Sequence, residues 1–225
     1  MNRIIFIALC CICFCQGAVA QHQATFDNYR EEVGGYASLF RGKIERGYSP
    51  YEYANHPYWE KESFYQGEVM YNGLLYTGLT LRYDTYLNCL IVQTPVRKVH
   101  VYVEMSGVEY FTLEKLRFVR HGETFVALHY DGTRMKLVQR VDCTFGNPIT
   151  KNNASYKNFK CISRYMLQRG GESYEVKSLS SVLKLFPAEK KELKQFAKER
   201  RLDFKENRGA SLAAIIAYAD RITQP

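Results

Sequence analysis

Apolar and polar residues alternate with a period of two through the middle of the chain. Leu79, Leu81 and Tyr83 are separated by polar residues, and the same alternation recurs at residues 99–104 and 135–141. Such alternation is typical of strands with one buried face and one solvated face. Turn signals fall between these segments, at Asn72-Gly73, Ser106-Gly107, Asp131-Gly132 and Gly170-Gly171.

This pattern predicts a sheet in residues 67–176. We expect about eight strands, near residues 68–71, 74–83, 89–93, 98–104, 109–111, 117–130, 134–142 and 159–176, with the longest spans broken by turns. Parallel strands need crossovers of about a dozen residues or more, so the short connections require antiparallel pairing. The sheet is expected to be curled or partly closed into a barrel.

The period changes to 3.6 residues after residue 176. A first helix, with Ser178 as its N-cap, presents an apolar stripe of Leu179, Val182, Leu183 and Phe186. Pro187 ends this helix and can serve as the first residue of the next, which presents Leu193, Phe196 and Ala197. Asn207 caps a third helix with a stripe of Leu212, Ile215, Ile216, Ala219 and Ile222. Because apolar stripes must be covered, residues 177–225 are predicted to pack as about three short helices on the sheet, in an α+β fold.

The first twenty residues have the features of a secretory signal peptide. Arg3 precedes an apolar run over residues 4–15, and Ala18 and Ala20 form a cleavage-like pattern of small residues. A helix that spans a membrane needs about 20 apolar residues, and this run is shorter. We therefore expect residues 1–20 to be removed and the mature chain, without a transmembrane span, to be exported to the periplasm, to the outer membrane or beyond the cell.

Only three cysteines remain after the signal peptide. Cys143 and Cys161 flank an irregular loop and can meet across a hairpin, where a disulfide would stabilise the fold by roughly 3 kcal/mol. Cys89 would then be left over. The alternative is that all three are small, buried apolar groups.

Three stretches of the chain carry a family resemblance. They are "HPYWEKESFYQGEVMYNGLLYTGLTLRYDTYLNCLIV" at residues 56–92, "FVALHYDGTRMKLVQR" at residues 125–140, and the segment of residues 163–208 that begins "SRYMLQRGGESYEVKS". With the signal peptide, they resemble a family of exported, uncharacterised Bacteroidetes proteins. The resemblance implies export and a β-sheet followed by helices, and it implies no activity.

The sequence contains none of the common catalytic motifs. No histidine pair has the spacing of a zinc site, and the chain has no nucleophile elbow, phosphate-binding loop or dinucleotide fingerprint. His100 and His129 fall in predicted strands, where convergence with Cys89 or Cys161 is the one alternative to ordinary strand histidines. Asp84 follows Tyr83 at a strand end and is predicted to cap a turn. We therefore predict no catalytic residue, no metal and no cofactor.

A basic edge is the first candidate binding site. Residues 177–208 hold ten Lys or Arg and five Asp or Glu, so +5 of the formal net charge of +8 lies there. On a helix, Lys190, Lys194, Lys198 and Arg201 form one continuous edge, which can meet an anionic surface, although an ordinary solvated face is the alternative. Export argues against a nucleic-acid partner.

An aromatic arm is the second candidate. Residues 21–66 show no sustained period, apart from a short helix expected at 24–33, and they are rich in rings. Tyr and Trp make good contact surfaces for proteins and sugars, because they bury a large rigid area at low entropic cost. The candidate binding residues are Tyr48, Tyr51, Tyr53, Tyr58 and Trp59. The alternative is that these rings complete the core of the sheet.

Together these features favour a non-catalytic protein of the cell envelope that binds or scaffolds another envelope protein. A carbohydrate-binding module that uses the aromatic arm is the second hypothesis. A hydrolase with an unrecognised site is the third.

Overall fold

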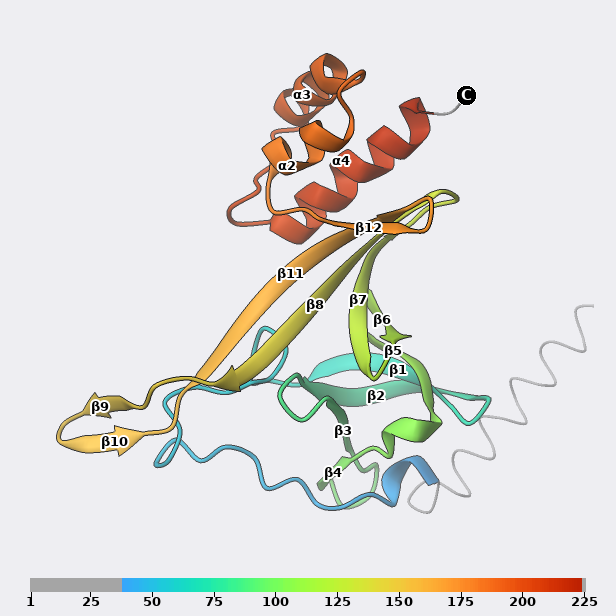
Figure 1. Ribbon diagram of the computed structural model, residues 1–225. Coiled ribbons are helices and arrows are strands. Elements are labelled where there is room, and N and C mark those ends of the chain that lie inside the picture. Colours follow the sequence, from blue (N-terminus) through green and yellow to red (C-terminus); the bar gives the residue numbers. More distant parts are fainter. Residues whose placement is uncertain (1–37, 224–225) are drawn as a thin grey trace, which may run out of the picture.

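The computed structural model describes residues 38–223 (Figure 1). The predicted signal peptide and the helix expected at 24–33 lie outside these residues. The α+β fold is confirmed, with a ten-stranded antiparallel sheet followed by three α-helices in the described part of the chain. The sheet is open and strongly curled, and it is not closed into a barrel. None of the described helices is long and apolar enough to cross a membrane.

The strands follow one another mostly as hairpins, in the order β12-β11-β8-β7-β6-β5-β1-β2-β3-β4. Their bounds are β1 Tyr65–Tyr71, β2 Leu74–Asp84, β3 Cys89–Gln93, β4 His100–Tyr102, β5 Val108–Leu113, β6 Leu116–His121, β7 Thr124–Asp131, β8 Met135–Phe145, β11 Phe159–Arg169 and β12 Glu172–Glu175. Short 3-10 helices lie at Ser38–Phe40 and Met105–Gly107. The long spans predicted at 117–130 and 159–176 are each broken by a turn, as expected. The stretch between Cys143 and Cys161, predicted as an irregular loop, instead contains a hairpin of β9 Ile149–Lys151 and β10 Ala154–Tyr156.

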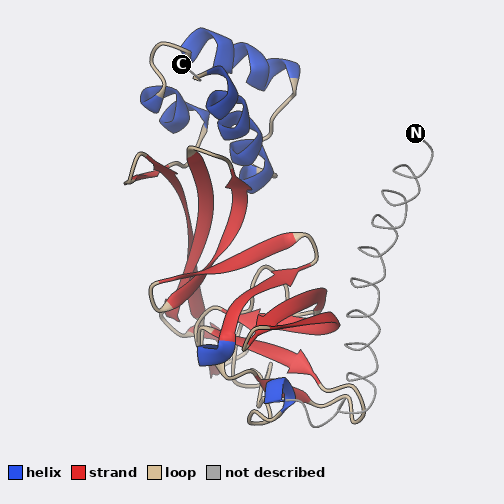
Figure 2. Cartoon of the chain, turned by 90° about the vertical axis from the view of Figure 1, so that its right-hand side faces the viewer, coloured by secondary structure: helices blue, strands red, loops and turns tan. Residues whose placement is uncertain are grey.

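Two separate cores hold the molecule together. The first lies under β1 to β7, where Phe111 and Phe118 are fully buried and the arm contributes Leu39 and Trp59. The second lies between the helices and the adjacent ends of β8, β11 and β12, around Leu137, Leu167 and Leu212. Figure 2 shows the helices gathered at one end of the sheet. The predicted packing of the helical segment on the sheet is therefore observed at that end.

The helices are α2 Leu179–Leu185, α3 Lys190–Glu199 and α4 Arg208–Ile222. Ser178 and Asn207 precede α2 and α4 as their N-caps, as predicted. The prediction that Pro187 begins the second helix is wrong, because α3 begins at Lys190 after a turn.

β8 and β11 are long enough to extend beyond the second core, and Val141 of β8 still packs against the first core. We call residues 140–145 of β8 and 159–164 of β11 the distal ribbon. Cys143 and Cys161 are directly opposed in this ribbon and are joined by a disulfide, the pairing that the sequence left open. The β9 and β10 hairpin continues the ribbon away from the body of the molecule (Figure 1).

Candidate functional site

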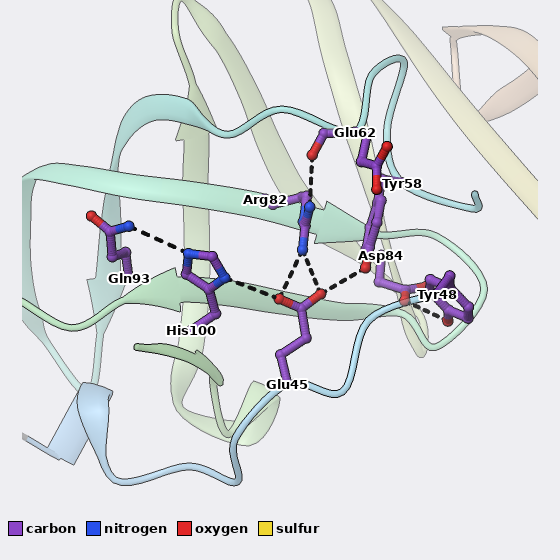
Figure 3. Close-up of polar contacts among 8 residues, drawn as sticks. All are labelled: Glu45, Tyr48, Tyr58, Glu62, Arg82, Asp84, Gln93 and His100. Atoms are coloured by element: carbon purple, nitrogen blue, oxygen red, sulfur yellow. Dashed lines mark hydrogen bonds and ion pairs between the residues drawn. The ribbon is translucent and has the colours of Figure 1, made fainter. Parts of the chain in front are cut away.

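A buried polar cluster fastens the arm to the sheet. The backbone nitrogen of Glu45 donates to the His100 oxygen at 3.0 Å, and the Tyr102 nitrogen donates to the Lys43 oxygen at 2.9 Å. The arm therefore pairs with β4 like a short extra strand, with Ile44 opposite Val101. This pairing carries the Glu45 side chain over β2 (Figure 3).

Glu45 and Arg82 form the centre of this cluster. Arg82 donates to both carboxylate oxygens of Glu45, at 2.6 and 2.8 Å, and the two side chains are only 10% and 3% exposed, respectively. Tyr58 Oη donates to the same carboxylate at 2.7 Å, and His100 Nδ1 lies 3.7 Å from it. Both Arg82 bonds come from Nη2, and charge-assisted hydrogen bonds of this kind are stronger than bonds between neutral groups.

The Arg82 guanidinium is also held between aromatic rings. Its central carbon lies 3.8 Å from the Tyr58 ring centre and 4.3 Å from that of Phe64. A further bond, of 2.7 Å, runs to the backbone oxygen of Glu62. The opposite side of the cluster continues through His100, whose Nε2 lies 3.3 Å from the Gln93 side-chain nitrogen.

Asp84 is a second buried carboxylate beside this pair. It accepts backbone bonds from Tyr86 and Leu87, both at 2.9 Å, so the predicted turn cap is confirmed. Tyr48 Oη donates to its other oxygen at 2.7 Å. Burial raises the pKa of Asp84 above its ordinary value of 3.8, although these hydrogen bonds oppose the shift.

The two phenols of the cluster remain protonated. Burial, together with hydrogen bonds to Asp84 and Glu45, raises the pKa of Tyr48 and Tyr58 well above the ordinary value of 10.0. Each phenol therefore acts as a fixed donor to a carboxylate, and each carboxylate oxygen of Glu45 and Asp84 accepts at least one hydrogen bond from within the chain. This arrangement suits a structural joint and offers no free base or nucleophile.

Asp84→Asn is expected to raise the free energy of unfolding at neutral pH and to leave it unchanged in acid. The raised pKa means that charging Asp84 costs more in the folded chain than in the unfolded chain. The penalty appears as the pH rises above 3.8 and is complete once the pH has passed through the raised pKa. Urea unfolding of both proteins across this pH window measures the difference.

Asp131→Asn is the matched control, because the Asp131 side chain is 51% exposed and pairs with Lys136 at 2.8 Å. We expect no comparable gain for it at neutral pH. A gain for Asp84→Asn that was equal at every pH would show that the buried charge is not its cause.

A second polar group lies at the waist between the two cores. His129 Nε2 lies 2.6 Å from Gln139 Oε1, and Gln139 Nε2 donates to Ser163 Oγ at 2.6 Å. Burial lowers the pKa of His129, so its imidazole is neutral at pH 7 and donates from Nε2. Gly209 of α4 lies against the other side of this ring, so close that a Cβ would be 2.6 Å from the His129 Cε1.

The hypothesis of a Cys-His site finds no support in this geometry. His129 bonds to Gln139, His100 contacts Glu45, and Cys161 is consumed in the disulfide. Within residues 38–223, no three His, Cys, Asp or Glu side chains gather as a metal site would require.

The aromatic arm is divided between the core and the surface. Tyr58 and Trp59 are buried, with Trp59 packed edge-on against Phe118 at 4.8 Å, so neither ring can contact a ligand while the arm stays on the sheet. Tyr48 is half-buried in the cluster around Asp84. Tyr51 is 90% exposed.

Half-buried Tyr53 stacks on Phe159 at the foot of the distal ribbon, next to an exposed apolar surface. We call Tyr86, Leu87 and Phe145 the foot patch. Their exposed fractions are 38%, 48% and 49%, and the rings of Tyr86 and Phe145 are 5.0 Å apart. No sequence pattern predicts this patch, because its residues come from a turn and a strand end that are distant in the chain.

The predicted basic edge is shorter than expected. Lys190, Lys194 and Lys198 are exposed along α3, while Leu193 and Ala197 on its other face are buried. Arg201 does not continue this edge, because α3 ends at Glu199 and Arg201 has a left-handed backbone with φ of 50°.

Comparison with known proteins adds no relative. No protein-family model, no curated protein and no solved structure matches this chain.

Proposed function

We propose that this chain is a non-catalytic binding or scaffold protein of the cell envelope, exported by the signal peptide at residues 1–20, and that it contacts another envelope protein. The foot patch is the observation that carries this proposal. The rings of Tyr86 and Phe145 are in contact, and with Leu87 they expose apolar side chains at the base of the distal ribbon, from which the β9 and β10 hairpin extends away from the body of the molecule. Exposed apolar patches rimmed by polar residues are typical of protein interaction sites.

The two buried polar groups support a non-catalytic role. In the first group, the carboxylates of Glu45 and Asp84 bond to other side chains and join the arm to the sheet. In the second group, the His129 imidazole bonds to the Gln139 amide, and Gly209 of α4 packs against the imidazole. Such groups stabilise the scaffold that carries the foot patch.

The carbohydrate hypothesis has less support from the geometry. Trp59, the ring with the largest stacking area, is buried against Phe118. Stacking a sugar on Trp59 would require the arm to leave the first core.

Phe145→Ser is expected to weaken capture of the envelope partner by about tenfold or more, because aromatic anchors at the centre of an interface contribute about 1–2 kcal/mol or more. The measurement is crosslinking in the intact envelope, followed by quantification of the specific partner band. Leu75→Ser is the matched control, because Leu75 is 40% exposed but lies at the start of β2, outside the foot patch.

Equal capture by Phe145→Ser and the wild-type chain would remove the foot patch from the interface. Failure of the wild-type chain to capture any specific protein, together with binding to envelope glycan, would favour the carbohydrate hypothesis instead.

A further inference from the structure

The outer edge of β11 is the feature of the distal ribbon with unused hydrogen-bonding capacity. The Gly146 nitrogen donates to the Asn158 oxygen at 2.8 Å, which sets the phase of the ladder between β8 and β11. In an antiparallel ladder, hydrogen-bonded pairs alternate with pairs that are not hydrogen-bonded. Gly146 and Asn158 are hydrogen-bonded, so every second residue of β11 after Asn158 keeps its bonds with β8. The residues between them direct their backbone N–H and C=O groups away from β8, and they are Phe159, Cys161, Ser163 and Tyr165.

This chain already occupies both ends of that edge. At one end, the Asn55 side chain donates to the Phe159 oxygen and accepts from the Phe159 nitrogen, both at 2.8 Å. At the other end, the Val176 nitrogen donates to the Tyr165 oxygen at 2.9 Å, and β12 pairs with the rest of β11. Both contacts confirm that the backbone N–H and C=O groups of the odd-numbered β11 residues point away from β8.

Cys161 and Ser163 lie in the gap between these two ends. Both residues are exposed, and their outward backbone groups have no hydrogen-bond partner within residues 38–223. A hollow of about 390 Å³ opens beside Ser163, lined also by Ile162, Arg164, Glu175, Val176 and Lys177. An exposed edge of this kind is a template for pairing with another strand.

The side chains around the gap are mostly basic, so they favour an acidic partner strand. Arg164 lies in this gap, and Arg140 lies across the ribbon from it. The two share one carboxylate, Asp142, at 3.1 and 2.6 Å. Lys160, at the other end of the gap, and Arg208, in the lining of the hollow, have no ion pair within the described residues. Glu175 and Lys177, which also line the hollow, form an ion pair with each other at 3.4 Å, so the gap is net positive.

A second copy of this chain fits the gap poorly. A two-fold axis through Ile162 would pair the outward groups of Cys161 with those of Ser163, but it would place Lys160 opposite Arg164 twice. Like charges directly opposite each other destabilise a strand pair.

We propose that an extended, acidic segment of the partner adds to β11 as an extra strand and bonds to the backbone of Cys161 and Ser163. This inference deepens the proposed function and depends on it. In strand addition the backbone bonds supply affinity and the side chains supply specificity. Acidic residues of the segment lie beside Lys160 and Arg164, and an apolar residue between them covers Ile162, which is 43% exposed.

The test uses the full chain and a fluorescein-labelled peptide, Ser-Thr-Glu-Thr-Val-Thr-Glu-Thr-Ser, whose binding is followed by fluorescence anisotropy. Ser163→Pro removes the outward N–H and leaves the inward ladder with β8 intact. Ser163→Ala is the matched control. Both variants lose the hydrogen bond from Gln139 to the Ser163 hydroxyl, but only Ser163→Pro also loses the backbone N–H. We expect Ser163→Pro to bind the peptide about tenfold or more weakly than Ser163→Ala.

Two peptide controls need no variant of the protein. Methylation of the peptide nitrogens that face β11 should reduce binding to the wild-type chain by a similar factor. Replacement of both Glu residues of the peptide by Lys should do the same. Equal binding of the methylated and unmethylated peptides, or self-association of the chain through this edge, would overturn the inference. The foot-patch experiment tests the proposed function separately from strand addition. Phe145→Ser can abolish capture of the partner even if no peptide binds to the edge of β11.

Discussion

Arg82→Met is expected to lower the free energy of unfolding by about 3–5 kcal/mol, because it leaves the Glu45 carboxylate buried without its counter-ion. The Glu45 side chain is 3% exposed and accepts two bonds from Arg82, so water cannot replace the guanidinium without opening the joint between the arm and β4. The ring contacts of Arg82 with Tyr58 and Phe64 are lost at the same time. Urea unfolding at neutral pH, followed by tyrosine fluorescence and circular dichroism, measures the change.

The double variant Glu45→Met with Arg82→Met separates the charge from the packing. Replacing both partners of a buried ion pair by apolar residues is often neutral, so the double variant should be more stable than Arg82→Met alone. Lys61→Met is the control for an exposed pair, since Lys61 and Glu114 are 47% and 62% exposed, and it should cost about 1 kcal/mol or less. A double variant no more stable than Arg82→Met would show that lost packing causes the effect.

The local pattern of the sequence was sufficient to predict most of the sheet. Strand β2 coincides with the predicted span 74–83 to within one residue, and β3 coincides with 89–93. Period two is a property of neighbouring residues, and so is the turn chemistry that separates the strands. The α2 and α4 caps at Ser178 and Asn207 were predictable for the same reason.

The candidate sites were not predictable, because each depends on contacts between distant residues. Glu45 and Arg82 are far apart in sequence, and only the pairing of the arm with β4 brings them together. Trp59 is of a residue type that is common at binding sites, yet its backbone nitrogen donates to the Tyr83 oxygen of β2 at 2.9 Å, and its ring lies in the first core. The open gap at Cys161 and Ser163 depends on where Asn55 and Val176 reach the edge of β11, which no local period encodes.

Replacement of both Cys143 and Cys161 by serine is expected to destabilise the distal ribbon by about 3 kcal/mol, the loop-closure entropy of the segment between them. The sequence separation of the pair is 18 residues, and the enclosed β9 and β10 hairpin is mostly exposed. Few buried contacts hold this part of the sheet, so the loss should appear as local opening rather than global unfolding.

Hydrogen exchange resolves this local opening. The inward-facing amides of Ile162 and Arg164 bond to β8, and they should exchange about a hundredfold faster in the double variant, as about 3 kcal/mol requires. Amides of Leu137 and Leu167, in the second core, should keep their protection. Cys89→Ser removes a thiol outside the disulfide and serves as the control. If all amides lost protection together, the ribbon would be part of the global cooperative unit. If only Ile162 and Arg164 lost protection, the disulfide would be what holds β11 in its ladder with β8, where a partner strand can add to the outer edge.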